Sequence, residues 1–182
     1  VRAIAKGVHG AAAFVASELK KLGYIIHTKL HFDTLVVAAD PARVRPVAEA
    51  KEINFRYTDN AVALSLDQTV EESDLHDIIA VFAQAAGKTW TKQRFSSQSV
   101  IQGTFAERKS GFLTHPVFNA HHSESEMMRY IKKLENRDLS LVHSMISLGS
   151  CTMKLDAASE LLPITWPEFA KIHPFAPENQ VE

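Results

Sequence analysis

Hydrophobic spacing in the first half of the chain switches repeatedly between a helical and a strand-like period, and this alternation restricts the fold most. Over residues 3–22, apolar residues recur at steps of four and three, which places them on one face of a helix. They are Val8, Ala12, Val15, Leu19 and Leu22. Gly23 follows directly and predicts the end of this helix, because glycine readily adopts the left-handed conformation found after a helix C-terminus.

Two pairs of short strand-type runs come next, and a helix follows each pair. The predicted strands cover 24–28, 34–39, 54–57 and 61–66. Between the pairs, Asp40-Pro41 predicts the start of a helix over about 41–52, with a carboxylate at the N-cap and proline at the first helical position.

A third helix is predicted after the second pair, capped by Ser73-Asp74 and ended by Gly87. The resulting order is helix, strand, strand, helix, strand, strand, helix. Segments this short favour an α/β fold in which a small, mostly antiparallel sheet carries its helices on one face. About 85 residues are enough for one compact core.

The remaining chain changes character twice. Residues 88–112 are basic and contain serine and glycine, which is typical of a linker. Residues 113–182 read as a helical and extended segment, with a capping box of Ser123 and Glu126 that opens a helix to about Asn136. A further helical run is predicted over about 155–162, and prolines punctuate the tail.

Composition excludes several classes of protein. The chain has 182 residues, of which 46% are hydrophobic and 23% charged, so it contains enough apolar surface to fold. Its longest apolar runs are six residues, whereas a membrane span needs roughly 20. A net charge of −1 without an obviously basic face predicts no nucleic-acid binding. A single cysteine excludes an internal disulfide framework and fits a reducing compartment.

Both ends of the chain read as cut. Val1 begins in what looks like the middle of a helix, without an initiator Met or a targeting segment, and the last residues stop within a proline-rich stretch. We therefore expect this chain to be a piece of a longer protein.

The densest polar cluster is Gly149-Ser150-Cys151-Thr152, which follows an apolar stretch. A glycine followed by small hydroxyl residues exposes backbone N–H groups, which can hold a phosphate or a carboxylate, particularly before a helix. An ordinary strand-to-helix turn with capping hydroxyls explains the same residues, because the string is not a complete P-loop.

Two reactive side chains lie in or beside this cluster. Cys151 could act as a nucleophile with a histidine as base, but a lone cysteine is more commonly a small buried thiol. Lys154 could form a Schiff base if it were desolvated, whereas a solvated lysine at a helix start is the simpler interpretation. The candidate bases are His115, His121, His122, His143 and His173.

Adjacent histidines also raise a metal-site hypothesis. His121-His122 is followed by Glu124 and Glu126, but neighbouring residues of a loop point apart and no HExxH spacing is present. Helix capping and solvation explain these residues better, and no metal site is predicted.

Several uncommon strings in the second half resemble the glycine decarboxylase family, the P-protein of the glycine cleavage system. The strings, in order, are THPVFN (114–119), HSESEMMRY (122–130), LGSCTMKL (148–155), PITWPEF (163–169) and HPF (173–175). The resemblance is strong over about 113–182 and looser over 1–112, where IQGTFAERKSGFLTHPVF marks the junction.

This resemblance implies a division of the chain. The family protein has two homologous halves, each with the type I fold of pyridoxal-phosphate enzymes. Residues 1–87 would be the small C-terminal domain of the first half, 88–112 a linker, and 113–182 the opening segment of the second, catalytic half. The α/β pattern of the first 87 residues agrees with such a small domain.

The resemblance also implies a reaction. Glycine condenses with pyridoxal phosphate and loses CO2, the cofactor acts as the electron sink, and the aminomethyl group passes to the lipoyl group of the H-protein. The family's Schiff-base lysine lies in a later HKTF-like string that this chain lacks, so we expect the chain alone to be inactive and assign it no catalytic residue. The full protein would lie in the cytoplasm of a bacterium or the mitochondrion of a eukaryote, as a dimer or two-subunit assembly.

Ser150, Cys151, Thr152 and Lys154 match a motif that lines the active-site region in the family. The resemblance implies that they bind substrate or cofactor and that His173, in the HPF motif, lies near the active-site entrance. Asp156 stands where the family usually has Asn, which adds a potential charge.

Two other functions remain as alternatives at this point. Two strand–strand–helix units can form a small ligand-binding sheet, so the chain could be a stand-alone regulatory module without catalysis. A metal hydrolase has only the number of histidines in its favour.

Overall fold

The computed structural model of the chain describes residues 1–96, 101–138, 143 and 158–181. The chain divides into two compact units, Val1–Arg108 and Lys109–Glu182, and each is described here by itself. None of the helices in the described part combines the length and the apolar character that crossing a membrane requires.

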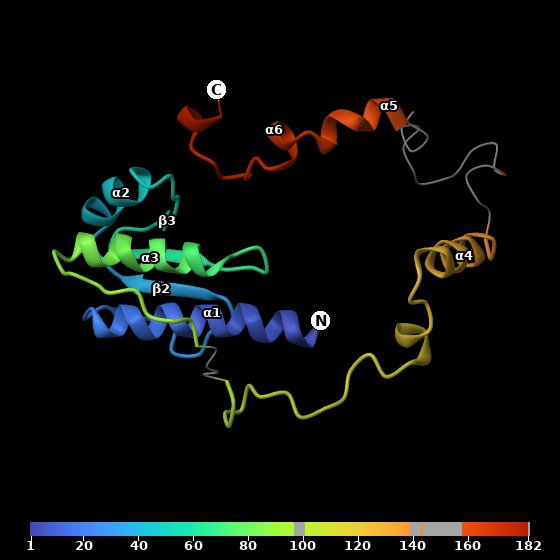
Figure 1. Cartoon of the computed structure of the whole chain (residues 1–182), viewed down its shortest axis with the longest axis horizontal. Coiled ribbons are helices and arrows are strands. Elements are labelled where there is room, and N and C mark those ends of the chain that lie inside the picture. The colour runs from blue at the N-terminus through green and yellow to red at the C-terminus, as the bar shows by residue number, and fades with distance from the viewer. Residues whose placement is uncertain (97–100, 139–142, 144–157, 182) are drawn as a thin grey trace. The chain divides into compact units, whose positions relative to one another are not determined.

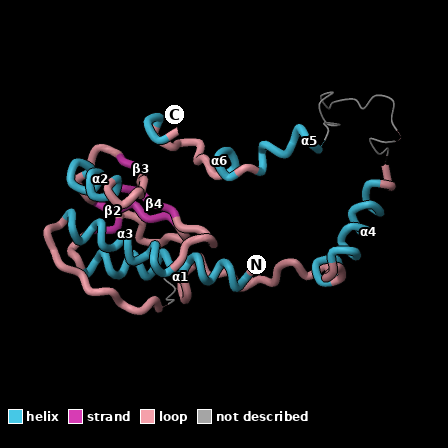
Figure 2. The backbone as a smooth tube through the Cα atoms, turned by 45° about the horizontal axis from the view of Figure 1, so that its top comes forward, coloured by secondary structure: helices cyan, strands magenta, loops and turns pink. Residues whose placement is uncertain are grey.

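The first unit contains a four-stranded antiparallel sheet and three helices (Figures 1 and 2). Its elements are α1 (Arg2–Lys21), β1 (Ile25–Ile26), β2 (Thr34–Ala38), α2 (Pro41–Glu49), β3 (Arg56–Tyr57), β4 (Ala61–Ser65) and α3 (Glu72–Ala85). The strand order is β1-β2-β4-β3, and Val37 of β2 pairs with Val62 of β4 at the centre. The predicted order of elements and the antiparallel sheet are confirmed.

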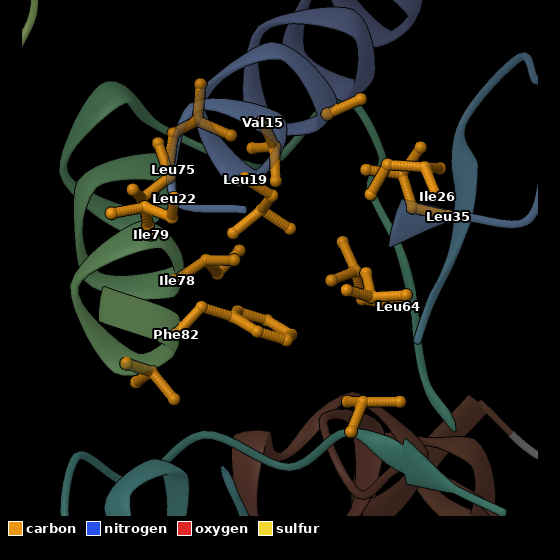
Figure 3. Packing of buried hydrophobic residues seen from close by; sticks show 14 of the residues in the cluster. Val15, Leu19, Leu22, Ile26, Leu35, Leu64, Leu75, Ile78, Ile79 and Phe82 are labelled. Atoms are coloured by element: carbon orange, nitrogen blue, oxygen red, sulfur yellow. The ribbon is translucent and has the colours of Figure 1, made fainter. Parts of the chain in front are cut away.

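The core lies between the helices and one face of the sheet. Alternate strand residues Leu35, Val37, Val62 and Leu64 are buried. Figure 3 shows side chains from α1 and α3 pointing toward those of the strands, with Phe82 among them. All five apolar residues predicted to form the inner face of the first helix are buried. Burial of these faces is the main driving force that holds the helices on the sheet.

Two glycines end the long helices, as the sequence predicts. Gly23 and Gly87 have φ of +91° and +66°, a region that residues with a Cβ rarely adopt. After α1 the Gly23 N–H bonds to the Lys20 carbonyl at 2.9 Å, and the Tyr24 N–H bonds to the Leu19 carbonyl at 3.0 Å. The same pair of bonds follows α3, and together they satisfy carbonyls that would otherwise lack partners.

Several predicted boundaries differ from the structure. Within 24–28 only Ile25–Ile26 pair with a neighbouring strand, and within 54–57 only Arg56–Tyr57 do. Both are edge strands of the sheet. The cap predicted at Ser73 is wrong. Helix α3 begins two residues earlier, with Glu71 at the N-cap and the Asp74 side chain accepting the Glu71 N–H at 2.8 Å.

Residues 88–95, which lie in the stretch predicted as a linker, cross the helices of the first unit and are bonded to them. The Lys88 ammonium donates to the Leu22 carbonyl, and the Trp90 indole N–H donates to Glu18 at 2.9 Å. The Phe95 N–H donates to Glu72 at 2.9 Å. The Phe95 ring packs edge-to-face with Phe14, with 5.6 Å between the ring centroids. We call residues 88–95 the strap.

The second unit contains short helices joined by extended chain. Its elements are η1 (Pro116–Asn119), α4 (Glu124–Glu135), α5 (Ala158–Leu161), η3 (Leu162–Thr165), α6 (Pro167–Ala170) and η4 (Glu178–Gln180). The capping box is confirmed, since the Glu126 N–H donates to Ser123 Oγ at 3.2 Å and Glu126 in turn accepts the Ser123 N–H. No residue described from 101 onward is buried.

Candidate functional site

Most of the predicted binding residues fall where the structure gives no description. Ser150, Cys151, Thr152 and Lys154, together with Asp156, lie outside the described residues. Their proposed role in binding therefore stays a prediction from the sequence.

His173 is the one predicted site residue that the structure describes. It follows α6 and is solvent-exposed. Its Nδ1 accepts the Phe175 N–H at 3.1 Å, and its carbonyl accepts the Ala176 N–H at 2.9 Å. The turn also brings the His173 and Phe175 rings to a centroid separation of 5.9 Å. This histidine is therefore held by local backbone hydrogen bonds while its side chain stays exposed.

His115 has the same local structure in another part of the second unit. Its Nδ1 accepts the Val117 N–H at 3.2 Å, and its carbonyl accepts the Phe118 N–H at 3.1 Å. From the sequence, His115 is predicted only as one of several possible bases. The repeated His-Pro dipeptide at 115–116 and 173–174 is the signal that would have linked the two histidines.

The histidines before α4 serve local structure. His122 Nε2 donates to the Asn119 carbonyl at 2.8 Å, and the His121 ring stacks on Tyr130 at 4.2 Å between centroids. The backbone N–H groups of Ser123 and His122 lower the pKa of Glu126 by stabilising its carboxylate. Within the described residues, no three His, Cys, Asp or Glu side chains gather as a metal site would require.

An open hollow of about 280 Å³ lies against this end of α4. Its walls come from His121, Glu126, Arg129, Tyr130 and Lys133, so basic groups outnumber the single carboxylate. The hollow is wide and one-sided, which suits a contact surface more than an enclosed site for a small molecule.

In the first unit, three polar side chains are buried, namely His9, Glu18 and His31. His31 lies beside His9 at 6.1 Å between ring centroids, and its Nδ1 donates to the Thr28 carbonyl at 3.1 Å. Among the described residues, its Nε2 has no hydrogen-bond partner. Burial lowers the pKa of His31 below the ordinary value of 6.5, although the hydrogen bond to the Thr28 carbonyl raises it. Electrostatic interactions with His9 and Lys20 also lower this pKa.

The side chain of Glu18 is only 4% exposed. Burial raises the pKa of this carboxyl, but hydrogen bonds from Lys21 and Trp90 and the charge of Lys21 outweigh burial, so the pKa lies below its ordinary 4.5. A cavity of about 150 Å³ lies next to it, between α1 and the strap. Each carboxylate oxygen of Glu18 already accepts a hydrogen bond, one from Lys21 and one from Trp90. This cluster is therefore structural.

Comparison with known proteins adds what the geometry leaves open. The sequence model of the family described as "Glycine cleavage system P-protein" matches residues 1–82. The chain is 52% identical over 181 residues to "Glycine dehydrogenase (decarboxylating)" of Flavobacterium johnsoniae, an alignment that covers 98% of this chain and 19% of that protein. Over nearly its whole length, this segment is similar to glycine cleavage system P-proteins.

Other P-protein relatives give the same result. The protein of that name from Christiangramia forsetii is 48% identical over 98% of this chain and 19% of its own length. "Glycine dehydrogenase (decarboxylating), mitochondrial" of Mus musculus is 46% identical over 98% of this chain and 18% of its own length. The chain thus spans about a fifth of the length of the curated relatives it matches.

Proposed function

We propose that this chain is part of a pyridoxal-phosphate-dependent glycine decarboxylase, which releases CO2 from glycine and passes the aminomethyl group to the lipoyl group of H-protein. The observation that carries the proposal is 52% identity, over 98% of the chain, to a protein named glycine dehydrogenase (decarboxylating). That alignment extends through both units, so it includes residues 114–119 and 148–155.

The division of the chain follows from the same resemblance. Residues 1–87 form the small C-terminal domain of a first type I half, 88–112 join the halves, and 113–182 open the second half. The antiparallel sheet with helices in the first unit supports this proposal.

Ser150, Cys151, Thr152 and Lys154 supply the groups that would bind glycine or the cofactor in the complete protein. Their hydroxyl, backbone N–H and ammonium groups can donate hydrogen bonds to the carboxylate of glycine or to the phosphate of the cofactor. His173 is the described residue of this predicted set, and its exposed imidazole can donate to the same anions. When bound, pyridoxal phosphate supplies an electron sink for the loss of CO2.

This chain by itself has no HKTF-like string that could provide the anchoring lysine, so it is inactive alone. Activity requires the remaining parts of the P-protein, as a dimer or a two-subunit assembly. We place that protein in the cytoplasm of a bacterium or in the mitochondrion of a eukaryote.

Exchange of labelled bicarbonate with the carboxyl group of glycine tests the function. The full-length protein with H-protein should show exchange and the absorbance of bound cofactor, whereas this chain should show neither. In the full-length protein, Thr152→Ala should reduce kcat/KM for glycine more than it lowers the melting temperature. Thr91→Ala, at an exposed threonine of the strap, is the matched control.

Three results would contradict the proposal. They are a lysine-bound cofactor on the isolated chain, no exchange by the full-length protein, and a Thr152→Ala variant with unchanged kcat/KM but a lower melting temperature. Calorimetric binding of one specific amino acid by this chain without cofactor would instead favour a regulatory module.

A further inference from the structure

The second unit contains two histidines with the same unusual hydrogen bonds. In each His-Pro turn, Nδ1 accepts the backbone N–H two residues on, and the histidine carbonyl accepts the N–H three residues on. The bond to Nδ1 and the bond to the carbonyl oxygen measure 3.2 and 3.1 Å at His115, and 3.1 and 2.9 Å at His173. The proline between them cannot donate a hydrogen bond, so the next available N–H is the one that the ring captures.

These bonds fix the tautomer of each ring. A nitrogen that accepts a backbone N–H carries no proton, so the proton of the neutral imidazole lies on Nε2. In that state Nε2 can donate a hydrogen bond but cannot accept a proton from a substrate. His31 has the opposite arrangement, because its Nδ1 faces a carbonyl and must carry the proton.

In the described part of the chain, Nε2 of both His115 and His173 lacks a hydrogen-bond partner, and both residues are exposed. His122 is a useful contrast, since its Nε2 already donates to the Asn119 carbonyl. The two His-Pro turns therefore hold an oriented N–H donor ready for an acceptor that other parts of the protein or a ligand must supply.

We propose that His115 and His173 act in the complete P-protein as Nε2–H donors to an anionic oxygen, and that neither acts as a general base. His173 is thereby a positioning residue of the site proposed above, and His115 is a second residue of the same kind. The proposal rests on the proposed function for the identity of the acceptor, which is a carboxylate or phosphate oxygen. The tautomers themselves are independent of that function.

Nitrogen-15 NMR of this chain at neutral pH tests the tautomers directly. Nδ1 of His115 and His173 should show the chemical shift of an unprotonated ring nitrogen and Nε2 that of a protonated one. His115→Asn and His173→Asn spectra assign the signals, because asparagine keeps an acceptor close to the position of Nδ1 and preserves the turn. Protonated Nδ1 at both residues in neutral rings would overturn the proposal.

Variants of the full-length protein test the role. His173→Asn keeps the turn but removes the Nε2 donor, whereas His173→Gln places an amide N–H near the Nε2 position but lacks the turn acceptor. We expect the Asn variant to lose about tenfold or more in kcat/KM for glycine, the factor that one hydrogen bond to a charged acceptor corresponds to, and the Gln variant to retain more activity. The same order is expected at His115. His27→Asn and His27→Gln, at an exposed histidine of the first unit, are the controls.

Separate changes in the KM for glycine and in the cofactor affinity distinguish a substrate carboxylate from a cofactor phosphate as the acceptor. Full activity of both Asn variants, together with a loss in the Gln variants, would show that the histidines only stabilise their turns. That result would overturn the proposal. Absence of exchange in the unmodified protein would contradict the proposed function, while the tautomers would remain measurable.

Discussion

The bond between Trp90 and Glu18 joins the strap to α1, and its removal gives a sharp test of what holds the strap in place. Trp90→Phe keeps an aromatic ring but removes the indole N–H that donates to Glu18 Oε2 at 2.9 Å. The carboxylate, only 4% exposed, then keeps Lys21 as its remaining side-chain partner among the described residues.

A hydrogen bond to a buried charged group contributes about 1.5–3 kcal/mol, so we expect the free energy of unfolding of the first unit to fall by about 2 kcal/mol. For a unit of this size, about 4 °C of melting temperature corresponds to each kcal/mol, which predicts a shift of about 8 °C. The pKa of Glu18 lies below 4.5 in the folded state. Its contribution is therefore present above the unfolded pKa and is lost as pH falls through the folded one, so the difference between the proteins should narrow in acid.

Urea unfolding followed by circular dichroism at pH 7 and pH 4 measures both effects. Trp166→Phe is the matched control, because that ring is 52% exposed and should change the unfolding free energy by less than about 0.5 kcal/mol. A double-mutant cycle with Glu18→Gln isolates the pair, and a coupling of at least about 0.5 kcal/mol is expected. A Trp90→Phe variant as stable as the unmodified chain at pH 7, or a coupling near zero, would refute the reasoning.

Two further predictions concern the same unit. Burial lowers the pKa of His31 in the folded state, so its contribution to the free energy of unfolding is complete above the ordinary value of 6.5 and is lost as pH falls below that value. His31→Gln should therefore flatten the pH dependence of the unfolding free energy between pH 7 and pH 5. His27→Gln, on the exposed side of the same loop, should leave that dependence unchanged. Gly23→Ala should destabilise the first unit by about 1–2 kcal/mol, because φ at this position is +91°. Gly7→Ala lies inside α1 with open space around its Cβ position and should stabilise the unit by about 0.5–1 kcal/mol. Equal effects of the two substitutions in thermal unfolding would contradict this prediction.

The fold of the first unit follows closely from its sequence because its signals are local. The spacing of Val15 and Leu19 places both on one helix face, and Gly23 supplies the conformation that ends that helix. Asp40 also caps α2 as predicted, with its side chain accepting the Ala42 N–H at 2.9 Å. The cap predicted at Ser73 was wrong, because the Asp74 side chain accepts the Glu71 N–H and the helix begins at Glu72.

The candidate site could be predicted from the sequence only in part. The donors at 150–154 were predicted from their residue types and from the resemblance, and they stay predictions. His173 was predicted from its motif, but its orientation was not. The hydrogen bond from the Phe175 N–H to Nδ1 depends on backbone torsions that residue types alone do not specify.

The order of helices and strands, their apolar faces and the two glycine ends were encoded in neighbouring residues, because periodicity and torsional preference act over a few positions. Only the tertiary structure paired Trp90 with Glu18, 72 residues away, and enclosed His31 beside His9. Contacts between distant residues depend on how the complete chain packs, and that packing also decides which polar groups lose water.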